Sequence, residues 1–171
     1  SEMCIRDRYK AVQPRWVTEF IFRHSPGKEA VVYMSLERTD ERVTAEEDSA
    51  ELFKSLAAID VKGTDVTSNE MAKTHARYLA GARPGDLPGE RLIRFEFPEH
   101  SGSLAAFLGS LTPEMFLTLL HYRNHGGQVG KVLAGITLPP EKHAEFYGVL
   151  DKLGFTYVDE TDNPIYQEFM R

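Results

Sequence analysis

The spacing of apolar residues in the second half of the chain alternates between the two periods that mark strands and helices. Residues 90–98 alternate with a period of two, with Ile93, Phe95 and Phe97 on one face, and predict a strand. The apolar positions of 100–111 recur at offsets of 0, 3, 4 and 7 and predict a helix. The order β-α-β-β-α-β then predicts an α+β fold, the ferredoxin-like sandwich, with both helices on one face of an antiparallel sheet. The remaining elements are expected as strands over 115–123, 130–138 and 155–160 and a helix over 140–154.

The first half of the chain repeats part of this pattern. The stretch "WVTEFIFRHSPGKEAVVYMSL" parallels "FLTLLHYRNHGGQVGKVLAGITL", each a strand, an arginine, a glycine-bearing turn and a strand. The alignment pairs Phe22 with Tyr122 and Leu36 with Leu138, so the first turn is expected to be two residues shorter. An amphipathic helix over 45–59 follows, and then a strand and a closing helix over 61–79.

These patterns divide the chain into four segments. Residues 1–14 begin "SEMCIRDRYK", without periodicity, and are expected to be a non-native or disordered tail. Residues 15–82 form a truncated first unit that lacks its opening strand and helix, 83–89 a glycine- and proline-rich linker, and 90–171 a complete second unit. Because burial stabilises by roughly 25 cal/mol per Å², an uncovered helix-sized face predicts a destabilised first half.

Composition narrows the classes of function. The 171 residues carry a formal net charge of −6, which disfavours nucleic acid and anionic membranes as main partners. No apolar run approaches the ~18–20 residues of a membrane span. The single cysteine, Cys4, excludes an internal disulfide and a cysteine-based zinc site, and a reducing, cytoplasmic setting is expected. No convergent set of nucleophile, base and oxyanion donor can be assembled, so the chain is not expected to be an enzyme.

Three polar motifs resemble ion or phosphate sites and are better explained as structure. "HYRNHGG" places His121 and His125 four residues apart, but along a strand they lie about 13 Å apart, too far to share a zinc ion. "GGQVGKV" has short spacing for a phosphate loop and lies between two strands, which favours a hairpin turn. "DETDN" lacks the glycine and closing glutamate of a calcium loop, and a turn before a helix capped by Asn163 explains it better. No metal site is expected.

"PEHSGSL", residues 98–104, is the most informative stretch for binding. A strand ends, a turn of small residues follows, and a helix begins, with Ser101 or Ser103 as its expected cap. Free backbone N–H groups at a helix N-terminus attract an anion such as the carboxylate of an amino acid. Gly102 lets a ligand approach the backbone, and Leu104 and Leu108 can line an apolar pocket beside it. A capped helix with core leucines and no ligand explains the same residues equally well.

Several long stretches together resemble one family, the C-terminal regulatory region of biosynthetic threonine ammonia-lyase, also called threonine dehydratase. The resemblance runs from about residue 15 to residue 171, in both units and in the same order. It implies two ACT-like subdomains, the first lacking its opening strand and helix. It is based on "VTEFIFRH", "NEMAKTHARYLAGARP", "FEFPEHSGSLAAFL", "LLHYRNHG", "GKVLAGI" and "LGFTYVDETDNP".

The resemblance also implies a function. The parent enzyme is a tetramer that uses pyridoxal phosphate to convert threonine to 2-oxobutanoate and ammonia in isoleucine biosynthesis. L-isoleucine binds the regulatory region and inhibits, and L-valine counteracts it. The catalytic domain, which would lie in cis and hold the cofactor, is outside this chain, so the chain is expected to bind and not to catalyse.

Site residues follow from the same resemblance. Gly102, Leu104 and Leu108 fall where the family's second subdomain controls feedback sensitivity, and Tyr122 falls on an effector-site tyrosine. Phe22 takes the matching position in the first subdomain, where the family can carry tyrosine, and the lost hydroxyl weakens that site. Ser103 belongs to the same turn as Gly102, and Glu99 or Asn124 can supply polar groups for the effector's ammonium.

Three other classes of function compete with this one. A free-standing ACT-like module that regulates another protein has the same fold, and an upstream reading frame would distinguish it. A ferredoxin-like RNA-binding domain would need exposed aromatics with basic flanks; Phe95 and Phe97 are present, but the net charge is wrong. An independent enzyme would need the catalytic set that the sequence does not offer.

Overall fold

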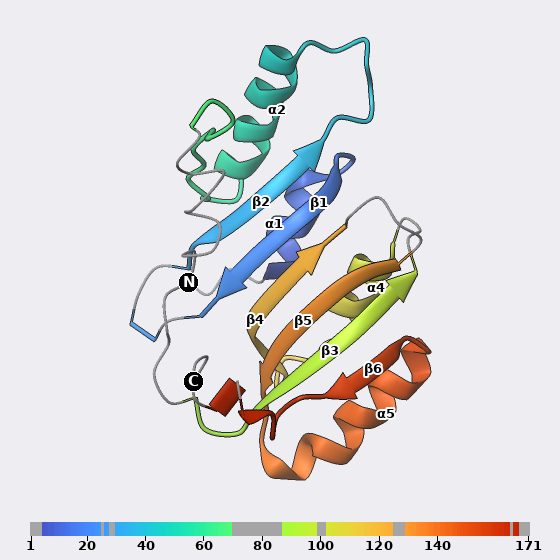
Figure 1. The fold of residues 1–171 in the computed structure, drawn as a ribbon. Coiled ribbons are helices and arrows are strands. Elements are labelled where there is room, and N and C mark those ends of the chain that lie inside the picture. The colour runs from blue at the N-terminus through green and yellow to red at the C-terminus, as the bar shows by residue number, and fades with distance from the viewer. Residues whose placement is uncertain are drawn as a thin grey trace.

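The computed structural model describes residues 5–24, 26–27, 30–69, 87–98, 102–124, 129–164 and 166–167. Its helices and strands follow the order α1-β1-β2-α2-β3-α4-β4-β5-α5-β6, with a short 3-10 turn, η2, before α5 (Figure 1). Every helix in these ranges is too short or too polar to cross a membrane. The elements are α1 (Ile5–Val12), β1 (Trp16–Arg23), β2 (Val32–Glu37), α2 (Ala45–Ala57), β3 (Glu90–Pro98), α4 (Ser103–Ser110), β4 (Phe116–Arg123), β5 (Val129–Thr137), η2 (Pro140–Lys142), α5 (His143–Leu153) and β6 (Thr156–Asp159).

The second half has the predicted β-α-β-β-α-β order. Its strands β3, β4, β5 and β6 lie in the spatial order β4-β5-β3-β6, and each neighbouring pair is antiparallel. Residue alternation explains this arrangement, because Ile93, Phe95 and Phe97 of β3 point to one face and are at most 1% exposed. The predicted α+β class and the ferredoxin-like second unit are therefore confirmed.

The two halves share one sheet, which the sequence did not predict. The six strands run in the order β2-β1-β4-β5-β3-β6, so that β1 of the first half pairs directly with β4 of the second (Figure 1). The expectation of two separate subdomain sheets is corrected to one continuous antiparallel sheet. Each half contributes one strand to the β1–β4 pair, which we call the seam.

The seam has a local two-fold symmetry that follows from the repeat. Phe20 pairs with Tyr122, and Phe22 pairs with Leu120. A two-fold rotation about the seam therefore places each β1 residue on the β4 residue whose number is 100 higher. The backbone N–H of His24 donates to the Thr118 carbonyl at 2.6 Å, and that of Asn124 donates to the Thr18 carbonyl at 3.0 Å. The two repeats are therefore related by an offset of 100 residues across the seam.

This offset corrects the alignment of the second strand in each repeat. Val17 pairs with Leu36 in the first half, and Leu117 pairs with Ile136 in the second. Leu36 is thus the counterpart of Ile136 and not of Leu138, and the expected difference in turn length is wrong. Both repeats also shift register at the same place, between Val17 and Glu19 and between Leu117 and Leu119.

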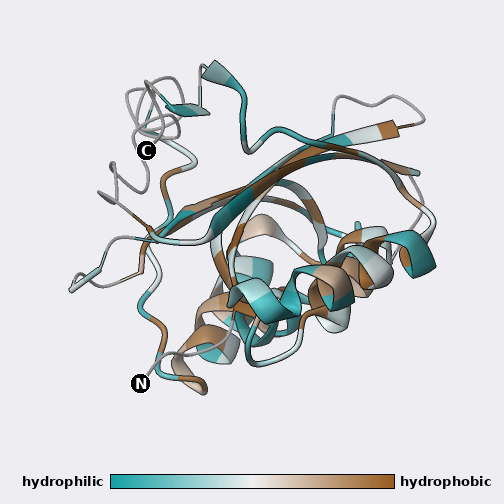
Figure 2. Cartoon of the chain, turned by 90° about the horizontal axis from the view of Figure 1, so that it is seen from below, coloured by the Kyte–Doolittle hydropathy of each residue, from teal (hydrophilic) through white to brown (hydrophobic). Residues whose placement is uncertain are grey.

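The helices lie on one side of the sheet and enclose the main core (Figure 2). Phe20 and Phe22 from β1 meet Leu120 from β4 in this core, and all three are at most 3% exposed. A smaller apolar cluster of Leu92, Leu119 and Tyr166 lies on the opposite face of the sheet. Side chains on both faces of the sheet are therefore buried, which is typical of central strands.

The segment that lacked periodicity is a helix. α1 covers Ile5–Val12, and its end residues Ile5 and Val12 are buried. Ile5 belongs to the main core, and Tyr9 packs against it. The expectation of a disordered tail does not hold for residues 5–12, and neither does the expectation that the first half lacks a helix before its first strand. α1 precedes β1 as α4 precedes β4.

The rest of the first half is less complete than the second. α2 forms as predicted and begins with a capping box between Thr44 and Glu47, but none of its residues is buried. The strand expected after it is absent from 61–69, the described part of that segment, and the closing helix lies outside the described residues. Of the described strands, only β1 is paired with β2, so β2 is the last described strand on that side of the sheet.

Candidate functional site

The candidate site begins at the N-terminus of α4. Gly102 is the N-cap residue and has φ +108°, a conformation that side chains other than glycine's rarely adopt. The Ser103 hydroxyl donates to the Pro98 carbonyl at 2.9 Å, and among the described residues no side chain caps the helix. Ser103 therefore does not cap the helix, and Ser101, the other predicted cap, lies outside the described residues. Backbone N–H groups in the first turn of a helix attract negative charge, such as that of a ligand carboxylate.

Strand register places the rest of the site at the same end of the sheet. Pro98, the last residue of β3, pairs with Val129 at the start of β5, beside the end of β4. Tyr122 and Asn124 lie at that end of β4, and both are half-buried. The structure thus brings Gly102, Ser103, Tyr122 and Asn124 to one end of the sheet.

The two leucines predicted to line the pocket are buried in the core. Leu104 and Leu108 of α4 are 5% and 4% exposed and belong to the main core, against which Tyr122 also packs. A ligand that reached them would lie between α4 and the sheet. Phe22 lies on the other side of the seam's two-fold axis, in the position that matches Tyr122, and so belongs to the counterpart site of the first half.

Other predicted residues and motifs have clear positions or lie outside the described residues. Glu99 and His125 lie outside them. His121 is on β4, as expected, and no group of three His, Cys, Asp or Glu side chains among the described residues could hold a metal ion. In the "DETDN" turn, the Asp159 carboxylate accepts from the Thr161 backbone N–H at 2.9 Å.

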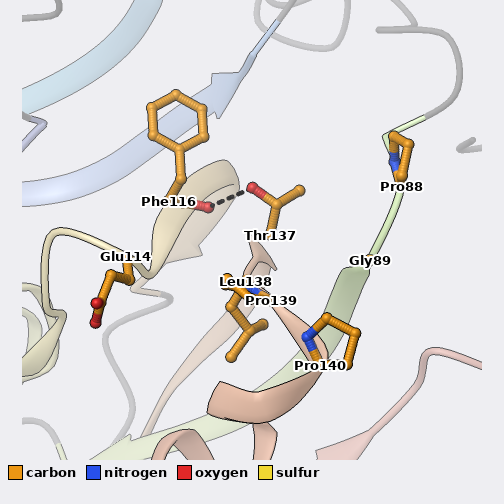
Figure 3. A pocket seen from close by; sticks show the side chains of 8 residues that line it. All are labelled: Pro88, Gly89, Glu114, Phe116, Thr137, Leu138, Pro139 and Pro140. Carbon is orange, nitrogen blue, oxygen red and sulfur yellow. Dashed lines mark hydrogen bonds between the residues drawn. The ribbon is translucent and has the colours of Figure 1, made fainter.

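A shallow pocket of about 430 Å³ lies at the other end of β4 (Figure 3). Phe116 starts β4, six residues from Tyr122, which is about 20 Å along a strand. The Thr137 hydroxyl donates to the Phe116 carbonyl at 3.5 Å beside the pocket. No predicted effector residue lines it, and the sequence reasoning missed it because its wall is formed by residues from three separate segments of the chain. The lining residues are Pro88, Gly89, Glu114, Phe116, Thr137, Leu138, Pro139 and Pro140.

A buried polar cluster was also missed. On the face opposite the helices, Glu90 of β3 forms an ion pair with Arg23 of β1 at 2.6 Å, and both side chains are at most 7% exposed. The hydroxyls of Thr118 and Tyr166 also donate to the Glu90 carboxylate. We call Arg23, Glu90, Thr118 and Tyr166 the Glu90 joint. The repeated arginine, Arg23 and Arg123, was the signal in the sequence that could have pointed to it.

A hydrogen bond between two titratable side chains joins α5 to β6. The Tyr147 hydroxyl donates to the Asp159 carboxylate. Burial, and then this hydrogen bond, raise the pKa of Tyr147 to about 12. Burial pushes the pKa of Asp159 up, but hydrogen bonds from Thr161 and Tyr147 hold it below its ordinary value. This pair lies away from the predicted site and stabilises the last strand of the sheet.

The fold is α+β with one antiparallel sheet, which is consistent with the class of ACT-like regulatory domains. Residues 84–170 match the family described as the C-terminal regulatory domain of threonine dehydratase. The chain belongs to this family of regulatory domains.

Curated relatives agree with the family. The chain is 42% identical over 170 residues to the mitochondrial threonine dehydratase of Saccharomyces cerevisiae, with 95% of this chain and 29% of that protein aligned. It is 36% identical to the biosynthetic L-threonine dehydratases of Burkholderia multivorans and Escherichia coli K12, with 93% and 91% of this chain aligned. In these two the alignment covers 30% and 29% of the relative. The chain therefore spans under a third of the length of these relatives.

Proposed function

We propose that this chain is the part of a threonine ammonia-lyase that binds a branched-chain amino acid as an allosteric effector. L-isoleucine is the proposed inhibitor, and L-valine is the proposed counteracting ligand. The observation on which this proposal mainly rests is the N-terminus of α4 at Gly102, which lies at the same end of the sheet as Tyr122 and Asn124 on β4. The family match supports a regulatory role, and the names of the relatives support the reaction.

The chemistry of these residues suits an α-amino acid. The first-turn N–H groups of α4 suit its carboxylate, since a helix N-terminus stabilises negative charge. The Asn124 side-chain oxygen, with Glu99 as the predicted second group, suits its ammonium. Leu104 and Leu108 suit a branched apolar side chain, whose burial favours binding by roughly 25 cal/mol per Å².

In the parent enzyme, regulation requires two states with different affinity for the effector. A ligand shifts an equilibrium only by as much as it prefers one state. We propose that the second state involves the catalytic domain, in cis, within a homotetramer that converts threonine to 2-oxobutanoate and ammonia. The cytoplasmic setting stays a prediction, since the names of two relatives place them in mitochondria.

Pyridoxal phosphate belongs in this proposal to the catalytic part of the parent enzyme. A lysine that forms a Schiff base has to be desolvated so that its amine is neutral. The lysines of the described ranges are exposed, apart from Lys142, which is half-buried and pairs with Glu114 at 3.2 Å and Glu145 at 2.9 Å. The described residues therefore do not fit this cofactor.

Phe22 marks a second, weaker site. It is the counterpart of Tyr122 across the seam, but it has no hydroxyl and is 3% exposed in the core. We propose that the first half binds the effector weakly or only when a strand covers β2. A single strong site per chain is the expected stoichiometry.

Calorimetric titration with L-isoleucine tests the proposal, with L-valine as second ligand and D-isoleucine as the stereochemical control. Saturable heat with L-isoleucine, near one site per chain, and none with D-isoleucine is the expected result. Tyr122→Phe, which removes only the hydroxyl, should weaken binding by about tenfold, as expected for one lost hydrogen bond. Absence of heat from a sample that circular dichroism shows to be folded would contradict effector binding by this chain.

A further inference from the structure

The Glu90 joint is a fully satisfied buried carboxylate that ties three distant parts of the chain together. Oε1 of Glu90 accepts from Arg23 Nη1 at 2.6 Å and from the Thr118 hydroxyl. Oε2 accepts from Arg23 Nη2 at 3.3 Å and from the Tyr166 hydroxyl. Four donors thus meet the roughly four acceptor sites of an ionised carboxylate.

The joint spans the sheet. Arg23 is on β1 and Glu90 is on β3, and β4 and β5 lie between them. Three interstrand steps amount to about 14 Å, which two long side chains cover across the face opposite the helices. Gly135 on β5 makes room, because a Cβ there would lie 2.8 Å from Glu90 Oε1 and 2.9 Å from Thr118 Oγ1.

Thr118 connects the joint directly to the seam. Its hydroxyl donates to Glu90, and its backbone carbonyl accepts the His24 N–H at 2.6 Å, one of the two hydrogen bonds that relate the repeats. The register shift at this position puts Thr118 and Leu119 on the same face. A displacement of the Glu90 side chain is therefore expected to shift Thr118 and with it the β1–β4 pairing.

The described residues of the first half are arranged differently at the matching positions. Ser35 occupies the position of Gly135, and its hydroxyl donates to Glu19 at 3.1 Å. Thr18, the counterpart of Thr118, donates to the Ser35 carbonyl at 3.3 Å. Among the described residues, the joint thus occurs once and connects Arg23 of the first half to three residues of the second.

We propose that Glu90 is a positioning residue that holds β1 and the C-terminal segment at Tyr166 in place on the second repeat, and so maintains the position of Tyr122 and Asn124, the effector-site residues at the seam. This inference rests on the proposed effector binding. A buried ion pair contributes little net stability compared with apolar residues of similar volume, whereas it specifies one arrangement strongly. Glu90 acts through Thr118 and Arg23 and does not touch the effector.

Glu90→Gln tests the proposal in the 171-residue chain. The glutamine amide has the same shape as the carboxylate, but its N–H₂ group would face hydrogen-bond donors of the joint and no acceptor. L-isoleucine should bind about tenfold more weakly, within the ~5–150-fold range of coupling between sites. The matched control is Glu96→Gln, an exposed glutamate on the same strand, which should leave the affinity unchanged.

Hydrogen exchange separates positioning from general stabilisation and does not depend on effector binding. In Glu90→Gln, the His24 and Asn124 amides should exchange about tenfold faster, while amides between β3 and β5 change less, because local opening differs from global unfolding. Uniform acceleration, or unchanged affinity with unchanged exchange, would overturn the proposal. If the unaltered chain binds no L-isoleucine, the proposed function fails. The hydrogen-exchange pattern alone then tests whether Glu90 holds the seam in place.

Tyr166→Phe keeps the test decisive if Glu90→Gln does not fold. It removes one donor and leaves the Arg23–Glu90 pair in place. The proposal expects a smaller loss of affinity and faster exchange at the seam amides. Unchanged exchange at the seam in Tyr166→Phe would show that the C-terminal segment is not held to the seam through Glu90.

Discussion

At single positions, the neighbouring strands limit the size of the side chain that fits, and Gly135 is the clearest case. The Glu90 and Thr118 side chains lie directly over its backbone. An added methyl group would be at 3.0 Å or less from three neighbouring atoms, including Leu119 Cβ. Packed interiors do not yield by that much without moving side chains or strands.

Gly135→Ala should lower the free energy of unfolding by about 1–3 kcal/mol, the usual cost of overpacking a core. Gly148→Ala is the matched control, because a methyl group added at this position of α5 would have nothing within 4 Å. That control should be neutral or stabilising by up to about 1 kcal/mol, since alanine favours helix over glycine. Urea unfolding of both variants measures the difference. Equal stability of the two variants would contradict the close packing at Gly135.

The Tyr147–Asp159 pair predicts a pH dependence at high pH. The pKa of Tyr147 is about 12 in the folded chain against an ordinary value of 10.0, so the folded state keeps the proton longer. This contribution to stability is fully present below about pH 10 and is lost as pH rises through about 12. Tyr147→Phe should therefore make the free energy of unfolding fall less steeply between these values. Urea unfolding at a series of pH values checks this, and an unchanged slope would refute it.

Elements were predictable wherever a local period decided their type. β3, β4, β5 and α5 match their predicted spans closely, because apolar spacing and Pro140 and Gly154 mark them. α1 was missed because it is short and polar, and its two buried end residues, Ile5 and Val12, carry too little pattern. Neighbouring strands were not predictable either. Only the folded chain shows that β1 pairs with β4, since that pairing depends on two edges meeting and not on local spacing.

The same limits apply to the candidate site. A turn that leads from strand to helix and contains Gly102 could be predicted from the sequence, and the structure adds that this glycine has a left-handed conformation. The deep burial of Leu104 and Leu108 was left open between pocket and core, and the structure places both in the core. The Glu90 joint was not predictable, because its residues come from parts of the chain up to 143 positions apart.

The first turn of α2 gives a prediction at the scale of an element. Thr44 accepts from the Glu47 N–H at 3.2 Å, and the Glu47 carboxylate accepts from the Thr44 N–H at 3.0 Å. Because α2 has no buried residue, its caps should contribute much of its local stability. Thr44→Ala should cost about 1 kcal/mol and raise amide exchange within α2. Thr39→Ala, an exposed residue in the loop before α2, is the control. Unchanged exchange in α2 would contradict the role of the cap.

At the scale of the whole molecule, two repeats of unequal completeness share one sheet. The second repeat encloses the core with four strands and two helices, whereas the first adds β1 and β2 and leaves β2 at the edge. Arg15, which is buried, ties the first half together by donating to both Asp48 carboxylate oxygens at 3.0–3.1 Å. α1 covers part of the face that was expected to be bare, so the first half is better supported than its sequence suggested.

This asymmetry predicts unequal local stability. β2 has no buried side chain and α2 has none, while β3 and β5 carry much of the core. Amides of β2 and α2 should therefore exchange at least about a hundredfold faster than those between β3 and β5, because local opening energies range from near zero to the global value. Native-state hydrogen exchange measures this. Equal protection throughout would show that the two halves unfold as one unit.

The most direct test of the account locates the effector on the sheet. Amide chemical shifts of the ¹⁵N-labelled chain are followed as L-isoleucine is added, with D-isoleucine as control. The account predicts that the largest shifts fall at Gly102, Ser103 and Tyr122, at the α4 end of the seam. Shifts centred on Phe116 and Leu138 would place the ligand in the pocket at the other end of β4 and contradict the proposed site.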